Sequence, residues 1–213
     1  MNPSSTPRSP FALAALCAVA LVAQQVGSKA VRDTLFLSNF PVTALPYMVM
    51  GAAAVSIVMV LLTSRPMRRF GPAWLVPRAL IVSATLLVAE WFIIAASPRL
   101  GSVLVYMHVA SLGSLLISGF WSVVNETFDP RSAKVQIGRL AVAAALGGVV
   151  GGLLVGRVAV WFDVHWVLPL LAALQVVAAL ALWPVRPPQN AWSAASSARD
   201  ASSAPSSIRR SSR

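Results

Sequence analysis

The amino-acid sequence predicts an all-α integral membrane protein, folded as a bundle of six transmembrane helices. Hydrophobic residues make up 57% of its 213 residues and charged residues only 11%, whereas soluble domains carry roughly 25% charged residues. The apolar residues also occur in runs that approach the roughly 20 residues needed to cross a hydrocarbon core about 30 Å thick. Composition and run length therefore agree on a chain whose main solvent is lipid.

The spans are recognised where charged residues are missing. The first begins after Pro10, is uncharged over residues 11–28 and continues as a helix toward Phe36. Ser97 and Pro98 break the helix between the third and fourth spans. The remaining five spans are expected at residues 41–64, 74–96, 102–124, 137–160 and 165–185.

The chain divides into three parts. Residues 1–10 are expected to form a cytoplasmic N-terminal segment, and residues 11–185 the six-helix transmembrane domain. Residues 186–213 are rich in Ser, Ala and Arg, a composition that predicts a disordered cytoplasmic tail. An alternative interpretation of the N-terminus is a cleaved signal peptide, with residues 11–23 as its apolar region. Cleavage there would leave five spans.

Basic residues predict the orientation. They gather in the second and fourth loops and in the tail. The positive-inside rule therefore places both termini in the cytoplasm. The expected location is the cell (inner) membrane, which the chain crosses several times. Lys29 and Arg32 are exceptions, because they lie toward the outer end of the first span. The net charge is +11, but the basic residues are scattered between apolar runs and form no single patch. We therefore predict no nucleic-acid partner. The lipid bilayer is the expected partner.

Several classes of site are not indicated. Cys17 is the single cysteine, and His108 and His165 lie far apart, so no cluster has the spacing of a zinc site. The sequence contains no metalloprotease, hydrolase, Walker or dinucleotide-binding signature. We therefore predict no enzymatic activity, no cofactor and no metal.

The first span carries a polar stripe. Its members recur at steps of three and four residues and so share one helix face: Gln25, Lys29, Arg32, Asp33 and Phe36. An ionisable group inside a span costs at least about 2.5 kcal/mol, so it usually faces a cavity or a partner. We predict that the stripe points into the bundle and that its four polar residues bind substrate. The two cations suit an anionic or phosphorylated molecule, and Asp33 can pair with Lys29 or take part in gating. The alternative is an interfacial helix end with snorkelling side chains.

Two further ionisable residues lie inside neighbouring spans. Glu90 falls in the third span and His108 in the fourth. Each is a candidate for proton binding or gating. The alternative for each is a packed polar residue that only satisfies a hydrogen bond within the bundle.

The fifth span is rich in glycine. Its two interleaved small-xxx-small ladders predict close packing of helix backbones, and a smooth face would also suit helices that slide during alternating access. The glycines are Gly147, Gly148, Gly151, Gly152 and Gly156.

Three segments resemble a known family. Residues 29–37, KAVRDTLFL, resemble the first-helix signature of the nucleotide transporters, the ATP/ADP translocase-like proteins within the major facilitator superfamily. Residues 120–126, FWSVVNE, followed by FDPR at 128–131 and the glycine-rich span, look like the same family's region around the fourth and fifth helices. The resemblance covers roughly residues 11–185. The fourth span departs from the pattern, because Tyr106-Met107-His108-Val109 stands where classical nucleotide exchangers carry an acidic residue.

The resemblance implies one half of a twelve-helix secondary transporter, with Lys29 and Arg32 at the positions of the family's helix-one cations and Asp33 at the acidic residue beside them. The expected function is transport or antiport of an anionic solute, with nucleotides as one candidate class, by alternating access. Such transport needs two halves, so a homodimer or a second six-helix half is expected. The alternatives are a non-transporting membrane scaffold or partner subunit, and a truncated, inactive transporter.

Overall fold

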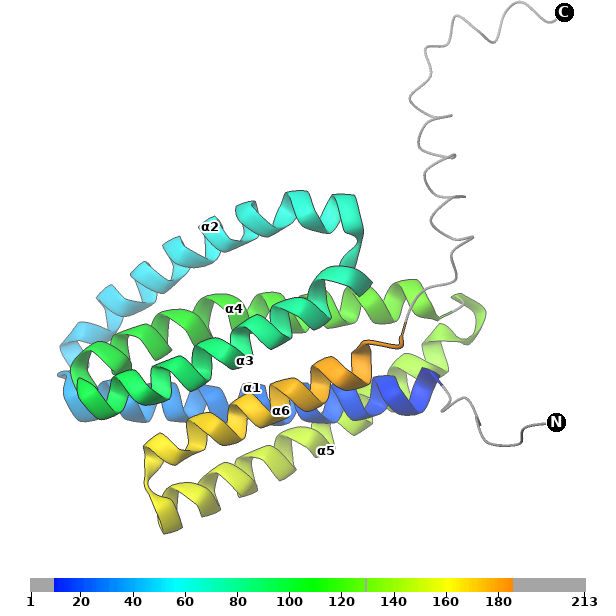
Figure 1. Ribbon diagram of the computed structural model, residues 1–213. Helices are drawn as coiled ribbons and strands as arrows, with labels where there is room; N and C mark the ends of the chain where they lie inside the picture. Colours follow the sequence, from blue (N-terminus) through cyan, green and yellow to red (C-terminus); the bar gives the residue numbers. More distant parts are fainter. Residues whose placement is uncertain (1–9, 129, 186–213) are drawn as a thin grey trace, which may run out of the picture.

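The computed structural model describes residues 10–128 and 130–185, and within them the predicted all-helical bundle is confirmed (Figure 1). Six long helices, each long and apolar enough to cross a membrane, are joined by short turns. The 3-10 turns are η1 (Val42–Ala44) and η2 (Val164–Trp166). The helices are α1 (Pro10–Asn39), α2 (Leu45–Phe70), α3 (Pro72–Ala96), α4 (Pro98–Thr127), α5 (Pro130–Phe162) and α6 (Val167–Leu182).

The helices begin where the sequence offers proline and end where it offers a turn. Pro72 and Pro98 each occupy a first helical position, where the missing N–H has no intrahelical acceptor to lose. Ser97 before Pro98 is extended, as expected for a residue that precedes proline. Gly71 joins α2 to α3 with φ 79° and ψ 161°, a conformation that is open almost only to glycine.

Three helices extend beyond the predicted spans. The fourth span was expected at residues 102–124, but α4 spans Pro98–Thr127. The second span was expected to end at residue 64, but α2 continues through Pro66 to Phe70. Pro66 removes a single backbone donor near the end of the helix, and the chain turns only at Gly71. The fifth span was expected from residue 137, close to the apolar span that begins at Val135, but the helix α5 itself begins at Pro130.

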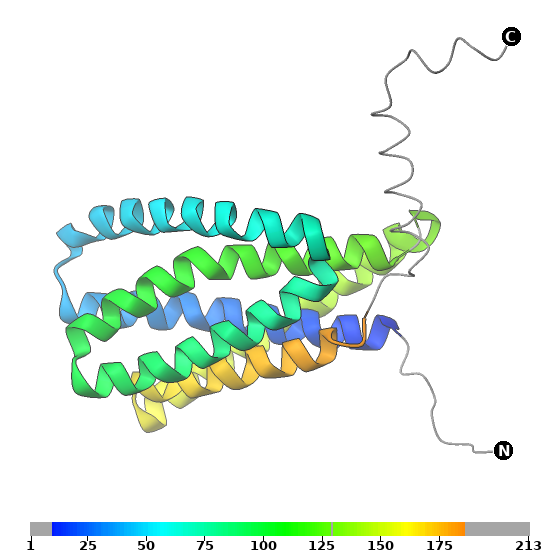
Figure 2. The same cartoon turned by 45° about the horizontal axis from the view of Figure 1, so that its top comes forward.

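The helices form two layers (Figures 1 and 2). The first layer contains α2, α4, α1 and α5 in that order, with α2 packed chiefly on α4 and α5 chiefly on α1. The second layer contains α3 and α6, which pack on each other and on α4 and α1 respectively. The helices run antiparallel to their neighbours in sequence, so Pro10 and Val185 lie at the same end of the bundle (Figure 1). We call this the terminal end and the opposite one the far end.

The packing repeats after three helices. Exchanging α1 with α4, α2 with α5 and α3 with α6 reproduces the same neighbours, since α1 packs on α5 and α6 as α4 packs on α2 and α3. Because α1 and α4 run antiparallel, the two triplets form an inverted repeat (Figure 1). The link after α5 even repeats the backbone of Gly71, with Asp163 at φ 89° and ψ 152°. Two related halves thus meet where α1 crosses α4.

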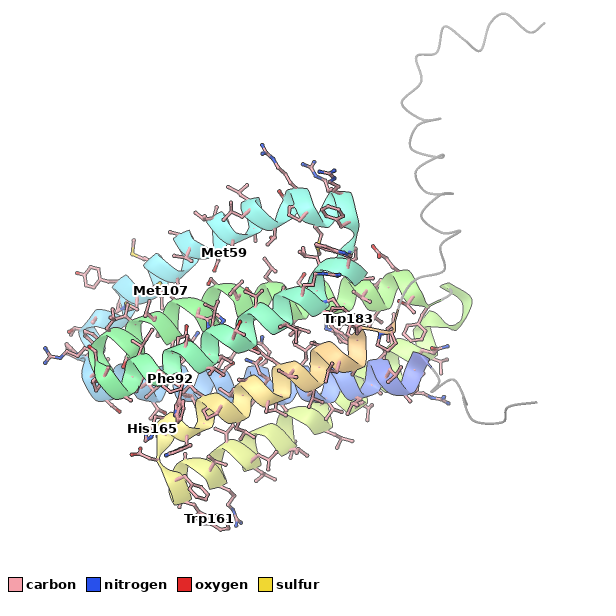
Figure 3. The ribbon with its side chains drawn as sticks, viewed as in Figure 1. Met59, Phe92, Met107, Trp161, His165 and Trp183 are labelled. Carbon is pink, nitrogen blue, oxygen red and sulfur yellow. The ribbon has the colours of Figure 1, made fainter. Side chains whose placement is uncertain are left out.

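Tryptophan side chains mark both ends of the bundle. Trp161, at the far end of α5, points away from the other helices, and Trp183 lies at the terminal end (Figure 3). Trp74 and Trp166 are also exposed, one at each end. Tryptophans concentrate at the two interfaces between a membrane and water, so their positions agree with helices that cross from one interface to the other.

Two glycines of α5 carry the close contact with α1. A Cβ atom at Gly147 would overlap the backbone of Val19, and one at Gly151 would overlap the backbone of Ala23. These pairs are each four residues apart on their helices, the spacing of a small-xxx-small crossing. The α1–α5 contact therefore depends on the absence of two side chains.

The other glycines of the two ladders contribute less. A Cβ atom at Gly148 would come 3.4 Å from Val22, and one at Gly152 would come 3.8 Å from Val26, which are tight and ordinary contacts respectively. Gly156 was expected to pack in the same way, and here the prediction is wrong. Nothing lies within 4 Å of its would-be Cβ atom. Each four-residue step turns the ladder by about 40° around the helix, so Gly156 turns away from α1, while the adjacent Val155 still packs against Gly27.

Candidate functional site

The polar stripe of α1 would lie within the thickness of a membrane that is centred on this helix. The helix has 30 residues, or about 45 Å at 1.5 Å per residue, so it exceeds a core of about 30 Å at both ends when it is centred. Its midpoint falls between Gln24 and Gln25. Lys29 and Arg32 then lie roughly 7 Å and 11 Å from the midplane. Both distances are inside the half-thickness of the core.

Gln25 ties α1 to α4 at this midplane. Its side chain is buried and its Nε2 donates to the backbone oxygen of Gly113 at 2.7 Å. A Cβ atom at Gly113 would lie only 3.0 Å from the same amide nitrogen, so the glycine provides the room for this hydrogen bond. The bond positions α1 against the middle of α4, directly before the charged part of the stripe.

Arg32 is held by two contacts. Its guanidinium lies over the ring of Tyr106, 4.6 Å from the ring centre, and its Nη2 approaches the Asp33 carboxylate at 2.8 Å. Tyr106 is buried and also touches the ring of Phe36. A cation over an aromatic face is stabilised by the ring quadrupole. Asp33 thus pairs with its neighbour Arg32, and not with Lys29.

Lys29 and Asp33 are the accessible members of the stripe. Lys29 is exposed, and the Asp33 side chain keeps 49% of its accessible surface against 20% for Arg32. At 3.6 residues per turn, Lys29 falls between the residues that face α4 (Gln25, Arg32 and Phe36) and those that face α5 (Val19 and Ala23). The prediction that the stripe points into the bundle therefore holds for Gln25, Arg32 and Phe36 only.

Lys29 thereby lies on the surface of the first layer opposite α3 and α6, which we call the open face. On α4 the exposed side chains of Ser114 and Ser118 lie on the same face, between the contacts to α1 and those to α2. Among the described residues, no acidic side chain lies within ion-pair distance of Lys29. The open face therefore has a polar centre with an unpaired cation.

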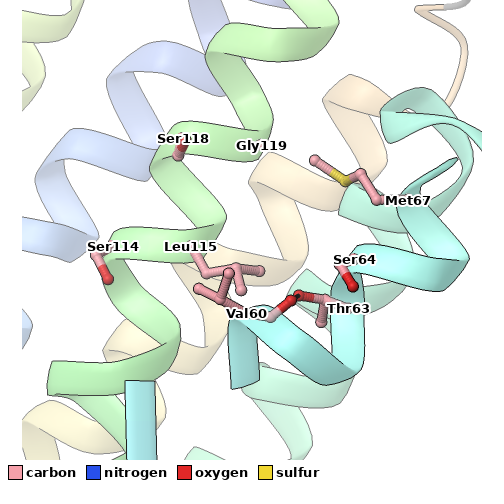
Figure 4. A pocket seen from close by; sticks show the side chains of 8 residues that line it. All are labelled: Val60, Thr63, Ser64, Met67, Ser114, Leu115, Ser118 and Gly119. Carbon is pink, nitrogen blue, oxygen red and sulfur yellow. Dashed lines mark hydrogen bonds between the residues drawn. The ribbon is translucent and has the colours of Figure 1, made fainter. Parts of the chain in front are cut away.

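A cleft of about 290 Å³ opens between α2 and α4, on the side of Ser114 that leads to the terminal end. Three serines and one threonine supply its polar atoms, and none of the predicted substrate-binding residues lines it. Figure 4 shows its walls, formed by Val60, Thr63, Ser64, Met67, Ser114, Leu115, Ser118 and Gly119. A second cleft, of about 250 Å³ between α1 and α5, is mainly apolar and also excludes the stripe's charges.

Glu90 and His108, which the sequence places on separate spans, meet in the structure. His108 Nδ1 lies 2.9 Å and 3.0 Å from the two carboxylate oxygens of Glu90. On the other side of the ring, Nε2 lies 2.8 Å from Ser83 Oγ. Gln175 of α6 donates its Nε2 to the same Ser83 oxygen at 2.9 Å. We call these four buried residues, Glu90, His108, Ser83 and Gln175, the polar chain.

Sequence reasoning missed Ser83 and Gln175. The signal was present for Gln175, which is the only residue of α6 with a charged or amide side chain. It lies at the middle of its helix, as Ser83 lies near the middle of α3, Gly113 near that of α4 and Gln25 near that of α1. A layer of polar groups thus crosses the bundle near its midplane, where sequence alone shows only isolated residues.

The other charged residue of α3 lies outside the site, and the predicted terminal segments lie outside the described residues. Arg78 stacks on Trp74 at 4.0 Å and donates to its backbone oxygen, away from the polar chain. Over residues 10–128 and 130–185, no three His, Cys, Asp or Glu side chains gather as metal ligands. Residues 1–9 and the tail at 186–213 are not among the described residues.

Comparisons with protein-family models, with curated proteins and with solved structures give no match to this chain.

Proposed function

We propose that this chain is one six-helix half of a secondary transporter of the cell membrane, which moves an anionic solute by alternating access. The observation that carries the proposal is the placement of Arg32, fixed over Tyr106 within the thickness of the membrane, next to the unpaired and exposed Lys29. Cations at this depth are costly in lipid and usually line a solvated pathway. Two cations against a single carboxylate leave a positive site, which suits an anion.

The contacts of Arg32 suggest how an anion would bind. Lys29 offers three ammonium donors, and Arg32 offers a fork of N–H groups that Asp33 occupies in part. An arriving phosphate or carboxylate would accept charge-assisted hydrogen bonds from both cations and compete with Asp33 for Arg32. Release of Asp33 would then report occupancy to the rest of α1, which is a gating role for this carboxylate. Nucleotides fit this chemistry as one class of phosphorylated solute.

The inverted repeat of the helices supports the proposal. Secondary transporters are commonly built from inverted repeats, with the solute bound near the midplane where the repeats meet. Here the two triplets meet at α1 and α4, and the stripe residues Gln25 and Arg32 form part of that contact. The position of the candidate site in the repeat is thus the one that this architecture favours.

A second copy of the chain is the proposed other half. On the open face, the polar centre around Lys29 is flanked by exposed apolar side chains of α2, such as Ile57 and Leu61, and of α5, such as Val149 and Leu153. Apolar edges around a polar centre suit two halves that contact each other around a solvated cleft. The positive-inside rule places the terminal end, with Arg65, Arg68 and Arg69, in the cytoplasm.

The proposed function predicts saturable counterflow. Purified protein in liposomes preloaded with an unlabelled anion should accumulate the same labelled anion transiently, since a carrier exchanges the two across one site. Labelled ATP, inorganic phosphate and a dicarboxylate are the probes, and protein-free liposomes give the background. A membrane scaffold or an inactive half would show only that background with all three probes, and this result would remove the proposal.

The dimer is tested by cross-linking from single cysteines. In a Cys17→Ala background, Ser118→Cys on the open face should form dimers with a bifunctional thiol reagent in nanodiscs. Phe92→Cys is the matched control, because Phe92 is exposed on α3 in the second layer. Electrophoresis should show a dimer band for Ser118→Cys alone. A stronger band for Phe92→Cys would place the partner on the opposite layer.

A further inference from the structure

We propose that the polar chain is a proton-binding site in which the hydrogen bonds reverse direction when one proton binds. It lies away from the open face, between α3, α4 and α6, and so is separate from the proposed anion site. Its ionisable members are bridged to α6 through Ser83 and Gln175. The ligand is a single proton, taken up at His108.

The four residues of the polar chain are buried, so a net charge on them is energetically costly. The exposed fractions are 6% for Glu90, 9% for His108, 1% for Ser83 and 2% for Gln175. Leu87 lies on α3 between Ser83 and Glu90 and belongs to an apolar cluster with Leu168 and Leu171. Such surroundings penalise a net charge much more than water does.

The hydrogen-bond partners suggest an assignment of the protons, which is part of the proposal. In this assignment Ser83 Oγ accepts from Gln175 Nε2 and directs its own hydrogen to His108 Nε2. His108 Nε2 is then an acceptor, and its other ring nitrogen, Nδ1, carries the proton that is donated to the Glu90 carboxylate. In this state the imidazole is neutral, the carboxylate is ionised and the polar chain carries one negative charge.

The neighbouring helices do not compensate that charge. No residue of α6 is ionisable, and on α1 the guanidinium of Arg32 is directed to Tyr106 and Asp33. On the two helices that bear the pair, and on η2, the other ionisable groups lie elsewhere or pair with one another. Arg78 contacts Trp74, and Tyr106 lies under Arg32. Arg99 and Glu126 are exposed. His165 lies near Asp163.

The side-chain oxygen of Gln175 supplies the hydrogen-bond acceptor that the protonated state needs. Its Oε1 is buried and has no hydrogen-bond partner, which is a costly arrangement. When a proton from water binds His108 Nε2, that nitrogen becomes a donor to Ser83 Oγ, and the Ser83 hydroxyl must find another acceptor. A half-turn of the Gln175 amide brings Oε1 to it, since the two ends of an amide have nearly the same size. The imidazolium and carboxylate then form a neutral pair.

The proton site deepens the proposed function by supplying a coupling ion, and only this coupling role rests on that function. Protonation changes the hydrogen bonds that join α3 and α4 to α6. Helices α3 and α6 form the second layer, against which α1 and α4 of the first layer pack. A proton could in this way shift the balance between the two orientations of a carrier.

The test is ¹⁵N NMR of the histidine rings in full-length protein in nanodiscs. The sequence has two histidines, so the variant His165→Gln leaves the signal of His108 alone. At high pH we expect the neutral ring with its proton on Nδ1, the tautomer that is less common in free histidine, and on acidification we expect one transition to imidazolium. A proton on Nε2 at high pH, or no transition between about pH 4 and 10, would overturn the proposal.

Two variants identify the partners that stabilise the protonated form. Glu90→Gln removes the carboxylate, and Gln175→Leu removes the acceptor for Ser83. Each should lower the midpoint of the His108 transition by about one pH unit or more, a tenfold loss in proton affinity. Gln24→Leu is the matched control, because Gln24 is also buried and also has an unpartnered Oε1, but lies on α1 outside the polar chain. An equal shift in this control would show that the effect is not specific.

The two proposals fail separately. If the His108 transition is as expected but no anion shows counterflow, the transporter proposal falls and the proton site stands. If counterflow occurs but the expected His108 transition is not observed, the proton-site proposal falls and the transporter proposal stands. Where both hold, the anion flux should depend on pH in the wild type and lose that dependence in Glu90→Gln.

Discussion

Arg32→Gln is expected to lower the anion counterflow of this protein by about 10- to 100-fold at limiting solute concentration. The guanidinium is held over Tyr106 and would form a charge-assisted hydrogen bond to the solute, worth about 1.5–3 kcal/mol, which corresponds to this range of affinity. Lys29→Gln should have a smaller effect, because Lys29 is more exposed and its charge is better screened by water. The measurement is the initial rate of labelled anion uptake into proteoliposomes at equal protein content.

Arg99→Gln is the control for this experiment. Arg99 is an exposed arginine at the far end, in the first turn of α4, so its loss removes the same charge without touching the stripe. Its uptake should remain within about twofold of the wild type, as expected when a distant and screened charge is removed. Equal losses in Arg32→Gln and Arg99→Gln would mean that only net charge matters, and the stripe would lose its assigned role.

Gly151→Ala is expected to lower the free energy of unfolding by about 1–3 kcal/mol, the usual cost of overpacking a tight contact. The added Cβ atom would overlap the backbone of Ala23, so α1 and α5 must move apart along their crossing. Gly147→Ala should act in the same way through Val19. The measurement is unfolding of detergent-solubilised protein by increasing mole fractions of SDS, followed by circular dichroism.

Gly156→Ala is the matched control on the same helix. Nothing lies within 4 Å of its would-be Cβ atom, and glycine inside a helix is unfavourable by roughly 0.5–1 kcal/mol relative to alanine. The control should therefore leave stability unchanged or raise it slightly. If Gly151→Ala and Gly156→Ala shift the unfolding curve equally, close packing of α1 on α5 is not what the glycine ladder provides.

The sequence by itself determined the class of fold and the approximate spans. Long apolar runs interrupted by charge and by residues such as Ser97 and Pro98 predict helices that cross a membrane, because an unpaired backbone is too costly in lipid. The small-xxx-small spacing of Gly147 and Gly151 likewise predicts a close helix crossing, although it does not identify α1 as the partner helix. The ends of α2 and α5 were less predictable, since a single proline or a short polar stretch does not stop a helix that its neighbours support.

The tertiary structure decided which residues meet. Spacing placed Lys29 and Arg32 on one face of α1, but only the packing against α4 and α5 shows that Arg32 turns to Tyr106 while Lys29 faces the open side. Glu90 and His108 could be singled out as ionisable residues in apolar spans, yet their hydrogen bond and its extension through Ser83 to Gln175 join helices α3, α4 and α6. The physical reason is that helical periodicity fixes direction within one span, whereas the rotation and depth of each span relative to the others are set by packing between residues far apart in the chain.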